Sequence, residues 1–505
     1  MAISLQPDTA TVTVAQGTLR GRRSGGVSGG VAAFLGVPFA AAPTGPRRMR
    51  APQPHPGWDG VRDAVAFGPT ATRADYIPQY VGLFPEPIIP GDECLNLNVW
   101  TPDPGAAGLP VFVWFHGGAF TNGSNAVSAY DGTAFARDGV VLVSANYRLG
   151  AEGFLYTGPE LANLGLLDQI AALEWVRDNI AAFGGDPGRV TIGGESAGAM
   201  SVVTLLATPR AAGLFQRAVA QSGAATNTLA PETALLVSRH LAEAVGVAPT
   251  REGFAGVDPD ELVTASRALL NEVQTAGDPA KWGALVQSLL PFAPVVDGDI
   301  VPAHPLDARP ADVPLLIGTN LEEARLMLVA SGAVDLIDEA TLHAATAGYG
   351  LPAEKAEEAV AAYRAARPGA SPGDLLAAVV TDWFFRVPAV RVAEARAGAP
   401  TWMYRFDWRS PTYDGRFGAA HGIEFPFVFD TISAPDLTRL IGPNPPQAVA
   451  DTTHAAWVRF ITGGDPGWAP YDTTVRATGV IGADGTLTVV DDPDGTELHL
   501  WEGHR

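Results

Sequence analysis

Short, mainly apolar runs of strand length recur along the first part of the chain, and turn residues bound each of them. Fully apolar runs suit strands that are covered on both faces, as in a parallel sheet. The runs cover residues 111–115, 140–145, 190–192, 218–220 and 315–317. We therefore predict strands of a mostly parallel sheet at these positions.

The segment LLDQIAALEWVRDNIAAF, between the second and third runs, has helical periodicity. Its apolar residues recur at three- and four-residue steps, at Leu166, Ile170, Leu173, Val176, Ile180 and Phe183. This spacing predicts an amphipathic helix that ends at Gly184 and Gly185. Strand, helix and strand in this order form a βαβ unit, so we expect an α/β sheet over at least the first 320 residues.

Residues 321–400 are rich in Ala, Glu and Arg and have helical spacing. We interpret them as a helical insertion beside the sheet. From residue 401, TWMYRFDW predicts one more strand, and residues 455–460 suggest a helix. No internal repeat or low-complexity linker divides the chain, so we expect one α/β domain over residues 1–505.

The composition indicates which classes of partner and which cellular compartment to expect. The 505 residues carry a net charge of −21, which argues against nucleic acid and anionic membranes as partners. Cys94 is the only cysteine, so neither an intrachain disulfide nor a site of several thiolates can form. The N-terminal residues lack a signal-peptide pattern, and no apolar stretch approaches the roughly 20 residues of a membrane span. We expect a soluble, cytoplasmic protein.

Ser196 lies in TIGGESAGAM, between an apolar run and a helix with apolar residues at Met200, Val203 and Leu206. A strand that enters a helix through G-E-S-A-G is typical of a nucleophile elbow. Such a turn is tight, so Gly194 and Gly198 would be required where a Cβ has no room. The alternative is a glycine-rich turn with an incidental serine.

A second glycine-rich loop favours the elbow. HGGAF follows the strand predicted at 111–115, and in elbow enzymes such a loop supplies backbone N–H groups that bind an oxyanion. We expect Gly118 and Ala119 as donors, together with Ala197 at the start of the helix. A flexible loop after a strand is the alternative.

A serine nucleophile needs a base and an acid, which follow it in the order Ser, acid, His in elbow enzymes. Among nine histidines, His421 in AAHGIEFPF comes late and is the favoured base. Three carboxylates near predicted strand ends are candidates for the acid, namely Asp297, Glu322 and Glu323. The residues alone do not choose among them.

The sequence resembles the type-B carboxylesterase family, which contains carboxylesterases and cholinesterases of the α/β-hydrolase fold. The resemblance runs along nearly the whole chain. It is carried, in the family's order, by FLGVPFAAAP, DECLNLNVWTP, NYRLG, NLGLLDQ, FGGDP, GGESAGA, FQRAVAQSG and HGIEFPFVF. The expected architecture is a large, mostly parallel sheet flanked by helices.

The resemblance implies the acid. The family's glutamate lies in a G-x-N-x-x-E segment, which Gly318, Asn320 and Glu323 match. The implied triad is Ser196, Glu323 and His421, with Gly118, Ala119 and Ala197 as oxyanion donors. Ser222 in AQSG matches a serine that lies near the acid and base in relatives. Its other interpretation is a strand-end hydroxyl satisfied by the backbone.

Two departures from the family bear on compartment and substrate. Many secreted relatives pair the cysteine at the Cys94 position with an upstream cysteine, which FGPTATR does not offer. In the loop between these two cysteine positions, cholinesterases carry a tryptophan that binds choline, whereas residues 71–90 hold Tyr76, Tyr80 and Phe84 and no tryptophan. Choline-ester specificity is therefore unsupported.

The resulting hypothesis is an acyl-enzyme hydrolase of small to medium carboxylic esters that needs neither metal nor cofactor. The alternatives are a non-catalytic adhesion or binding member of the fold, a lipase, and an amidase or peptidase. An intact triad argues against the first, and the charged insertion does not favour a lipase lid. Candidates for lining the substrate pocket are Phe292, Trp383, Phe384 and Phe385. Oligomeric state is not predicted.

Overall fold

The computed structural model describes residues 9–24, 30–276, 278–308, 310–396 and 398–504. The chain divides into two compact units. Unit 1 comprises Met1–Asp75, Glu86–Val219 and Thr226–Val313, and unit 2 comprises Tyr76–Pro85, Ala220–Ala225 and Pro314–Arg505. Residues 1–8, where the sequence shows no signal-peptide pattern, lie outside the described residues.

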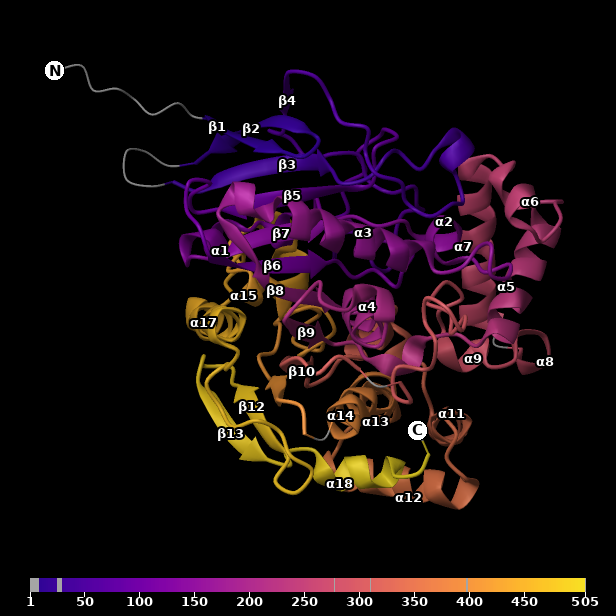
Figure 1. The fold of residues 1–505 in the computed structure, drawn as a ribbon. Coiled ribbons are helices and arrows are strands. Elements are labelled where there is room, and N and C mark those ends of the chain that lie inside the picture. Colours follow the sequence, from indigo (N-terminus) through magenta and orange to yellow (C-terminus); the bar gives the residue numbers. More distant parts are fainter. Residues whose placement is uncertain (1–8, 25–29, 277, 309, 397, 505) are drawn as a thin grey trace. The chain divides into compact units, whose positions relative to one another are not determined.

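The strands of unit 1 form a sheet in the order β1-β2-β3-β5-β7-β6-β8 (Figure 1). Strand β6 pairs in parallel with both β7 and β8, whereas β1, β2, β3, β5 and β7 pair antiparallel in succession. The strands are β1 (Thr9–Val14), β2 (Gly17–Arg23), β3 (Ala32–Pro38), β5 (Asn96–Thr101), β6 (Leu109–Phe115), β7 (Val141–Ala145) and β8 (Gly185–Glu195), with the short β4 (Val61–Asp63) beside β2. The strands predicted in this unit are present at β6, β7 and β8.

The predicted helix between β7 and β8 is α3 (Leu164–Asn179), which continues as a 3₁₀ turn (Ile180–Phe183) and ends at Gly184 in the left-handed region. Its register buries Leu166, Ile170 and Leu173. The other helices of unit 1 are α1 (Thr133–Arg137), α2 (Gly150–Phe154), α4 (Ala197–Leu206), α5 (Pro231–Ala244), α6 (Arg251–Ala255), α7 (Pro259–Ala276), α8 (Pro279–Trp282) and α9 (Leu285–Ser288).

The strands of unit 2 follow the order β10-β11-β12-β13, and the first three are parallel to one another. They are β10 (Leu315–Asn320), β11 (Thr401–Phe406), β12 (Ala477–Ile481) and β13 (Leu487–Asp491). Strand β9 (Arg217–Gln221) belongs to both units, because the boundary falls after Val219. The strands predicted at 218–220, 315–317 and from 401 are therefore present.

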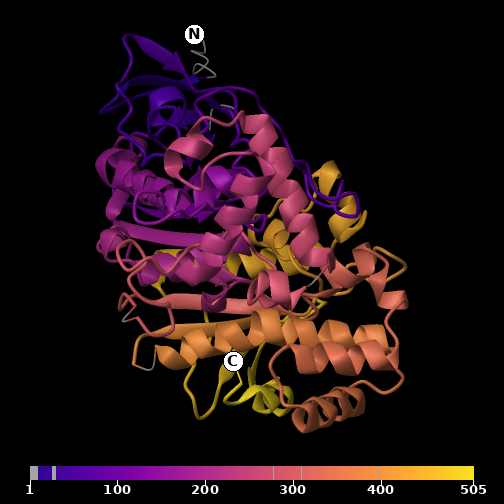
Figure 2. The ribbon, with the colours of Figure 1, turned by 90° about the vertical axis from the view of Figure 1, so that its right-hand side faces the viewer.

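Between β10 and β11 the chain is helical, as predicted for 321–400. Figure 2 shows the continuous run of turns formed by α13 (Pro372–Thr381), the π-helix η7 (Asp382–Arg386) and α14 (Val387–Ala395). The remaining helices of unit 2 are α10 (Arg325–Ala330), α11 (Glu339–Gly348), α12 (Ala353–Ala366), α15 (Phe425–Val428), α16 (Thr438–Ile441), α17 (Gln447–Gly463) and α18 (Gly495–Leu498). Within the described ranges, no helix combines the length and the apolar character needed to cross a membrane.

Candidate active site

Ser196 lies in the turn between β8 and α4 of unit 1. Its backbone has φ 54° and ψ −121°, which is strained for a residue with a side chain. A serine that precedes a helix commonly caps the first turn, but the Ser196 hydroxyl makes no capping hydrogen bond. Ser196 is also less buried than its neighbours on either side. The turn therefore presents the hydroxyl instead of using it to hold the helix, as predicted for a nucleophile elbow.

The glycines beside Ser196 are required by close backbone packing. A Cβ on Gly198 would lie 2.0 Å from the carbonyl oxygen of Phe115. A Cβ on Gly194 would lie 2.4 Å from the carbonyl carbon of Gly198. Helix α4 thus starts directly against the end of β6, which leaves no room for a side chain at either position.

The loop after β6 runs beside this turn. A Cβ on Gly117 would lie only 3.2 Å from the Cβ of Ser196. Gly118 and Ala119 have φ of 114° and 54°, and the Asn122 amide closes the loop by donating to the Gly118 carbonyl at 2.8 Å. In the described part of the chain, the amides of Gly118, Ala119 and Ala197 donate no hydrogen bond to another residue.

His116 begins this loop and stiffens it. Its Nδ1–H donates to the Gly117 carbonyl at 2.8 Å, and its ring stacks on Tyr147 with centroids 4.5 Å apart. The Tyr147 hydroxyl in turn donates to the His116 carbonyl at 2.7 Å. Burial lowers the pKa of His116 to about 4, so the ring is neutral at pH 7.

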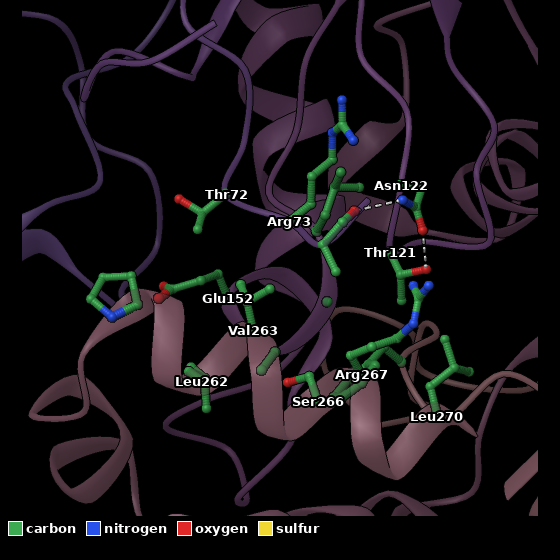
Figure 3. A pocket seen from close by; sticks show the side chains of 16 residues that line it. Thr72, Arg73, Thr121, Asn122, Glu152, Leu262, Val263, Ser266, Arg267 and Leu270 are labelled. Carbon is green, nitrogen blue, oxygen red and sulfur yellow. Dashed lines mark hydrogen bonds between the residues drawn. The ribbon is translucent and has the colours of Figure 1, made fainter. Parts of the chain in front are cut away.

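A pocket of unit 1 starts at Thr121 and Asn122, just beyond Ala119 (Figure 3). Helix α7 forms its other side with Leu262, Val263, Ser266 and Leu270, and the buried Phe292 also lines it, as suggested from the sequence. The two arginines at the pocket have partners. Arg73 pairs with Glu86, and Arg267 donates to the Asp75 carbonyl at 2.9 Å. The side that α7 contributes is mainly apolar, with Leu262, Val263 and Leu270 beside the polar Ser266 and Arg267.

Unit 2 brings Glu323 and His421 together. The His421 Nδ1–H donates to Glu323 Oε2 at 2.7 Å, and the backbone N–H of Asn320 donates to Glu323 Oε1 at 2.6 Å. The His421 amide also donates to the Glu323 carbonyl at 3.1 Å. Glu323 is fully buried and His421 is 7% exposed. This carboxylate fixes the ring orientation and the tautomer with the proton on Nδ1.

The two other carboxylates proposed from the sequence lie elsewhere. Oε2 of Glu322 accepts from Arg409 at 2.9 Å and from the Ala419 amide at 3.0 Å. Asp297 belongs to unit 1, where it accepts from Asn163 at 3.0 Å. Of the three candidates, Glu323 is the one bonded to His421.

Sequence reasoning missed the polar residues around this pair. Glu424 is fully buried and accepts hydrogen bonds from Asn320 at 2.7 Å and from Gln221 at 3.1 Å. Burial, followed by the nearby charge of Glu323, raises the pKa of Glu424. The one available signal was its position three residues after His421 in HGIEFPF.

Ser222 also belongs to unit 2. Its φ is 53°, and its amide donates to the Gly318 carbonyl at 2.9 Å. Its buried hydroxyl has no hydrogen-bond partner among the described residues. The backbone hydrogen bond that the simpler interpretation predicted for this hydroxyl is therefore not formed.

Cys94 is buried as a free thiol, and burial raises its pKa to about 12. Over the described ranges, no group of three or more His, Cys, Asp or Glu side chains is arranged to hold a metal ion.

Known proteins resemble this chain over nearly its whole length. Residues 8–480 match the carboxylesterase family. The chain is 36% identical to the para-nitrobenzyl esterase of Bacillus subtilis and 36% identical to the phenmedipham hydrolase of Pseudarthrobacter oxydans, each over 94% of this chain and 96% of the relative. A carboxylesterase structure from Geobacillus stearothermophilus superposes with a TM-score of 0.82 at 36% identity, covering 97% of this chain and 99% of that one. The chain therefore belongs to the carboxylesterase family, has its α/β-hydrolase fold and is an ester hydrolase.

Proposed function

We propose that Ser196, His421 and Glu323 are the catalytic triad of this ester hydrolase. Ser196 attacks the ester carbonyl while His421 Nε2 takes its proton, and the alcohol leaves as His421 returns that proton. Water then attacks the acyl-enzyme with His421 again as the base. The observation that carries the proposal is the 2.7 Å bond from His421 to the buried Glu323, which leaves Nε2 as the basic nitrogen.

Backbone amides stabilise the tetrahedral intermediate in this proposal. Gly118, Ala119 and Ala197 donate to the oxyanion, and each amide has no competing acceptor among the described residues. The neutral, stacked His116 keeps the loop rigid without adding a charge. Losing one such donor typically costs about 2.7–4 kcal/mol of transition-state stabilisation. Ser222 is proposed as a supporting hydroxyl, because it is buried and has no partner among the described residues.

The proposed substrates are small to medium carboxylic esters, one end of which enters the pocket bordered by Thr121 and α7. Its largely apolar α7 side suits a neutral group. A para-nitrobenzyl ester is a reasonable further test, since one relative is named for that substrate. We also propose a cytoplasmic location, on the basis of the single buried thiol. The proposed partners are small-molecule esters. The acidic net charge argues against binding to nucleic acid or to membranes.

The first test is hydrolysis of p-nitrophenyl acetate, butyrate, octanoate and laurate by the wild type and by Ser196→Ala. We expect turnover that declines towards laurate and falls by about 10⁴-fold or more without the Ser196 hydroxyl. Ser201→Ala is the matched control, because its buried hydroxyl lies in α4, directly after the Ser196 turn, where it donates to the Ala197 carbonyl and accepts from Gln169. Equal activity in wild type and Ser196→Ala would overturn the proposed nucleophile.

A further inference from the structure

The π-helix η7 interrupts the helical run of unit 2 next to Glu323 and His421. The Val387 amide donates to the Asp382 carbonyl, five residues earlier, which is the π-helical pattern. Pro388 follows directly, and in a regular α-helix its ring would clash with the Phe384 carbonyl. The wider turn therefore has a local cause. Single π turns inside α-helices also occur frequently at functional sites.

Three side chains of the segment Thr381–Arg386 contact either His421 or the backbone near Glu323. Thr381 Oγ1 accepts from the Ala324 amide at 3.1 Å, just after Glu323. Arg386 Nη2 donates to the carbonyl of Leu321, two residues before Glu323, at 2.9 Å. The Phe385 ring lies against the His421 ring, with centroids 4.8 Å apart and planes tilted by 41°.

We propose that Thr381, Phe385 and Arg386 are positioning residues that hold the Glu323 carboxylate and the His421 imidazole in register. Two of them fix the backbone on either side of Glu323, and the third limits rotation of the imidazole. Over the described ranges, none of the three side chains forms a hydrogen bond with the Glu323 carboxylate or the His421 ring. They act through the backbone and through packing.

Arg386 is itself held by a buried network. Its guanidinium pairs with Asp382, and its Nε lies 3.4 Å from Asp494 Oδ2. The Tyr363 hydroxyl donates to Asp382 at 2.6 Å. Arg386 is 4% exposed and Asp382 is fully buried, so neither charge is solvated when the pair is broken. Such a network fixes one side-chain geometry, which a positioning residue requires.

This inference rests on the proposed function, since it assigns a role relative to the proposed acid and base. Its test compares Arg386→Met with Arg386→Lys, which keeps a positive donor. We expect kcat to fall about 10- to 100-fold in Arg386→Met with KM within about twofold, because misplacing a catalytic group by about 1 Å costs on this order. We expect Arg386→Lys to recover part of the loss.

Proton NMR supplies a readout that does not depend on turnover. The Nδ1–H of His421 in its short bond to Glu323 should give a far-downfield signal, assigned by its disappearance in Glu323→Gln. We expect the signal to shift or broaden by exchange in Arg386→Met. Phe385→Leu leaves the ion pairs intact, so it serves if Arg386→Met does not fold, and we expect a smaller change of the same kind.

Arg405→Met is the matched control, because Arg405 also pairs with Asp494, at 2.8 Å. Over the described residues, the Arg405 side chain donates to Asp407 and Asp494 and not to residues 320–324. The inference fails if Arg405→Met changes kcat and the signal as much as Arg386→Met does. It also fails if the folded Arg386 and Phe385 variants keep wild-type kcat and signal while Glu323→Gln is inactive. Full activity of Glu323→Gln would instead overturn the proposed function, and this inference with it.

Discussion

At the scale of single residues, His116, which begins the loop after β6, makes the free energy of unfolding depend on pH. Its pKa is lowered to about 4 by burial, whereas an unfolded histidine titrates near 6.5. As the pH falls below 6.5, the unfolded chain takes up a proton that the folded protein does not. The folded state therefore loses stability from pH 6.5 down to about 4, and above pH 6.5 this residue imposes no loss.

We expect His116→Gln to remove this part of the pH dependence, since glutamine does not titrate. Between pH 7 and pH 5 the free energy of unfolding of the wild type should fall about 2 kcal/mol more than that of the variant. Urea unfolding at the two pH values measures the difference. His343→Gln, at an exposed position, is the control. Equal falls in His116→Gln and the wild type would show that His116 is not held neutral.

Residue types and spacing predicted the Ser196 turn better than the acid. The elbow is local, because a strand, two glycines and a helix start all lie within a few positions of the serine. Glu322 and Glu323 are adjacent and identical in type. Their difference arises from hydrogen bonds to distant residues, namely Arg409 and Ala419 for the first and His421 for the second. Without the family resemblance, no local pattern carried that information.

At the scale of elements, helix α7 supplies the apolar side of the pocket in Figure 3. We expect Val263→Trp to fill space there and to shorten the accepted substrate. Relative to wild type, kcat/KM should fall at least about 10-fold more for p-nitrophenyl octanoate than for the acetate, because the longer chain loses more apolar contact. Ala268→Trp, at an exposed position of the same helix, is the control. A uniform loss across the esters would argue against this pocket as the binding site.

Three of the elements missed from the sequence, β1, β13 and η7, lack the signal that identified the others. Strand β1 alternates exposed and buried residues, so it contains no fully apolar run. Strand β13 has no buried residue at all, and its position depends on pairing with β12. The π turn of η7 has no periodicity of its own over five residues, and Pro388 was its only local indication. Strands β6, β7 and β8 were predictable because burial on both faces favours apolar runs, whereas the fully buried β5 was missed because it carries Asn96, Asn98 and Thr101.

At the scale of the whole molecule, the prediction of one domain remains to be tested. The chain passes between the units at residues 75/76, 85/86, 219/220, 225/226 and 313/314. One of these crossings falls inside β9. Unfolding one unit alone would therefore unfold one part of this strand and leave the other part folded. We therefore expect the units to unfold together.

Two core truncations test this cooperativity. Leu173→Ala in α3 and Leu375→Ala in α13 each remove a fully buried side chain, one from each unit, and each should cost about 2–5 kcal/mol. If the chain unfolds as one domain, calorimetry will show a single transition that both variants move to lower temperature. If the units unfold separately, each variant will shift only its own transition and the scan will resolve into two peaks. Scans at several heating rates are needed, because a chain of this size can unfold irreversibly and the apparent Tm then depends on scan rate.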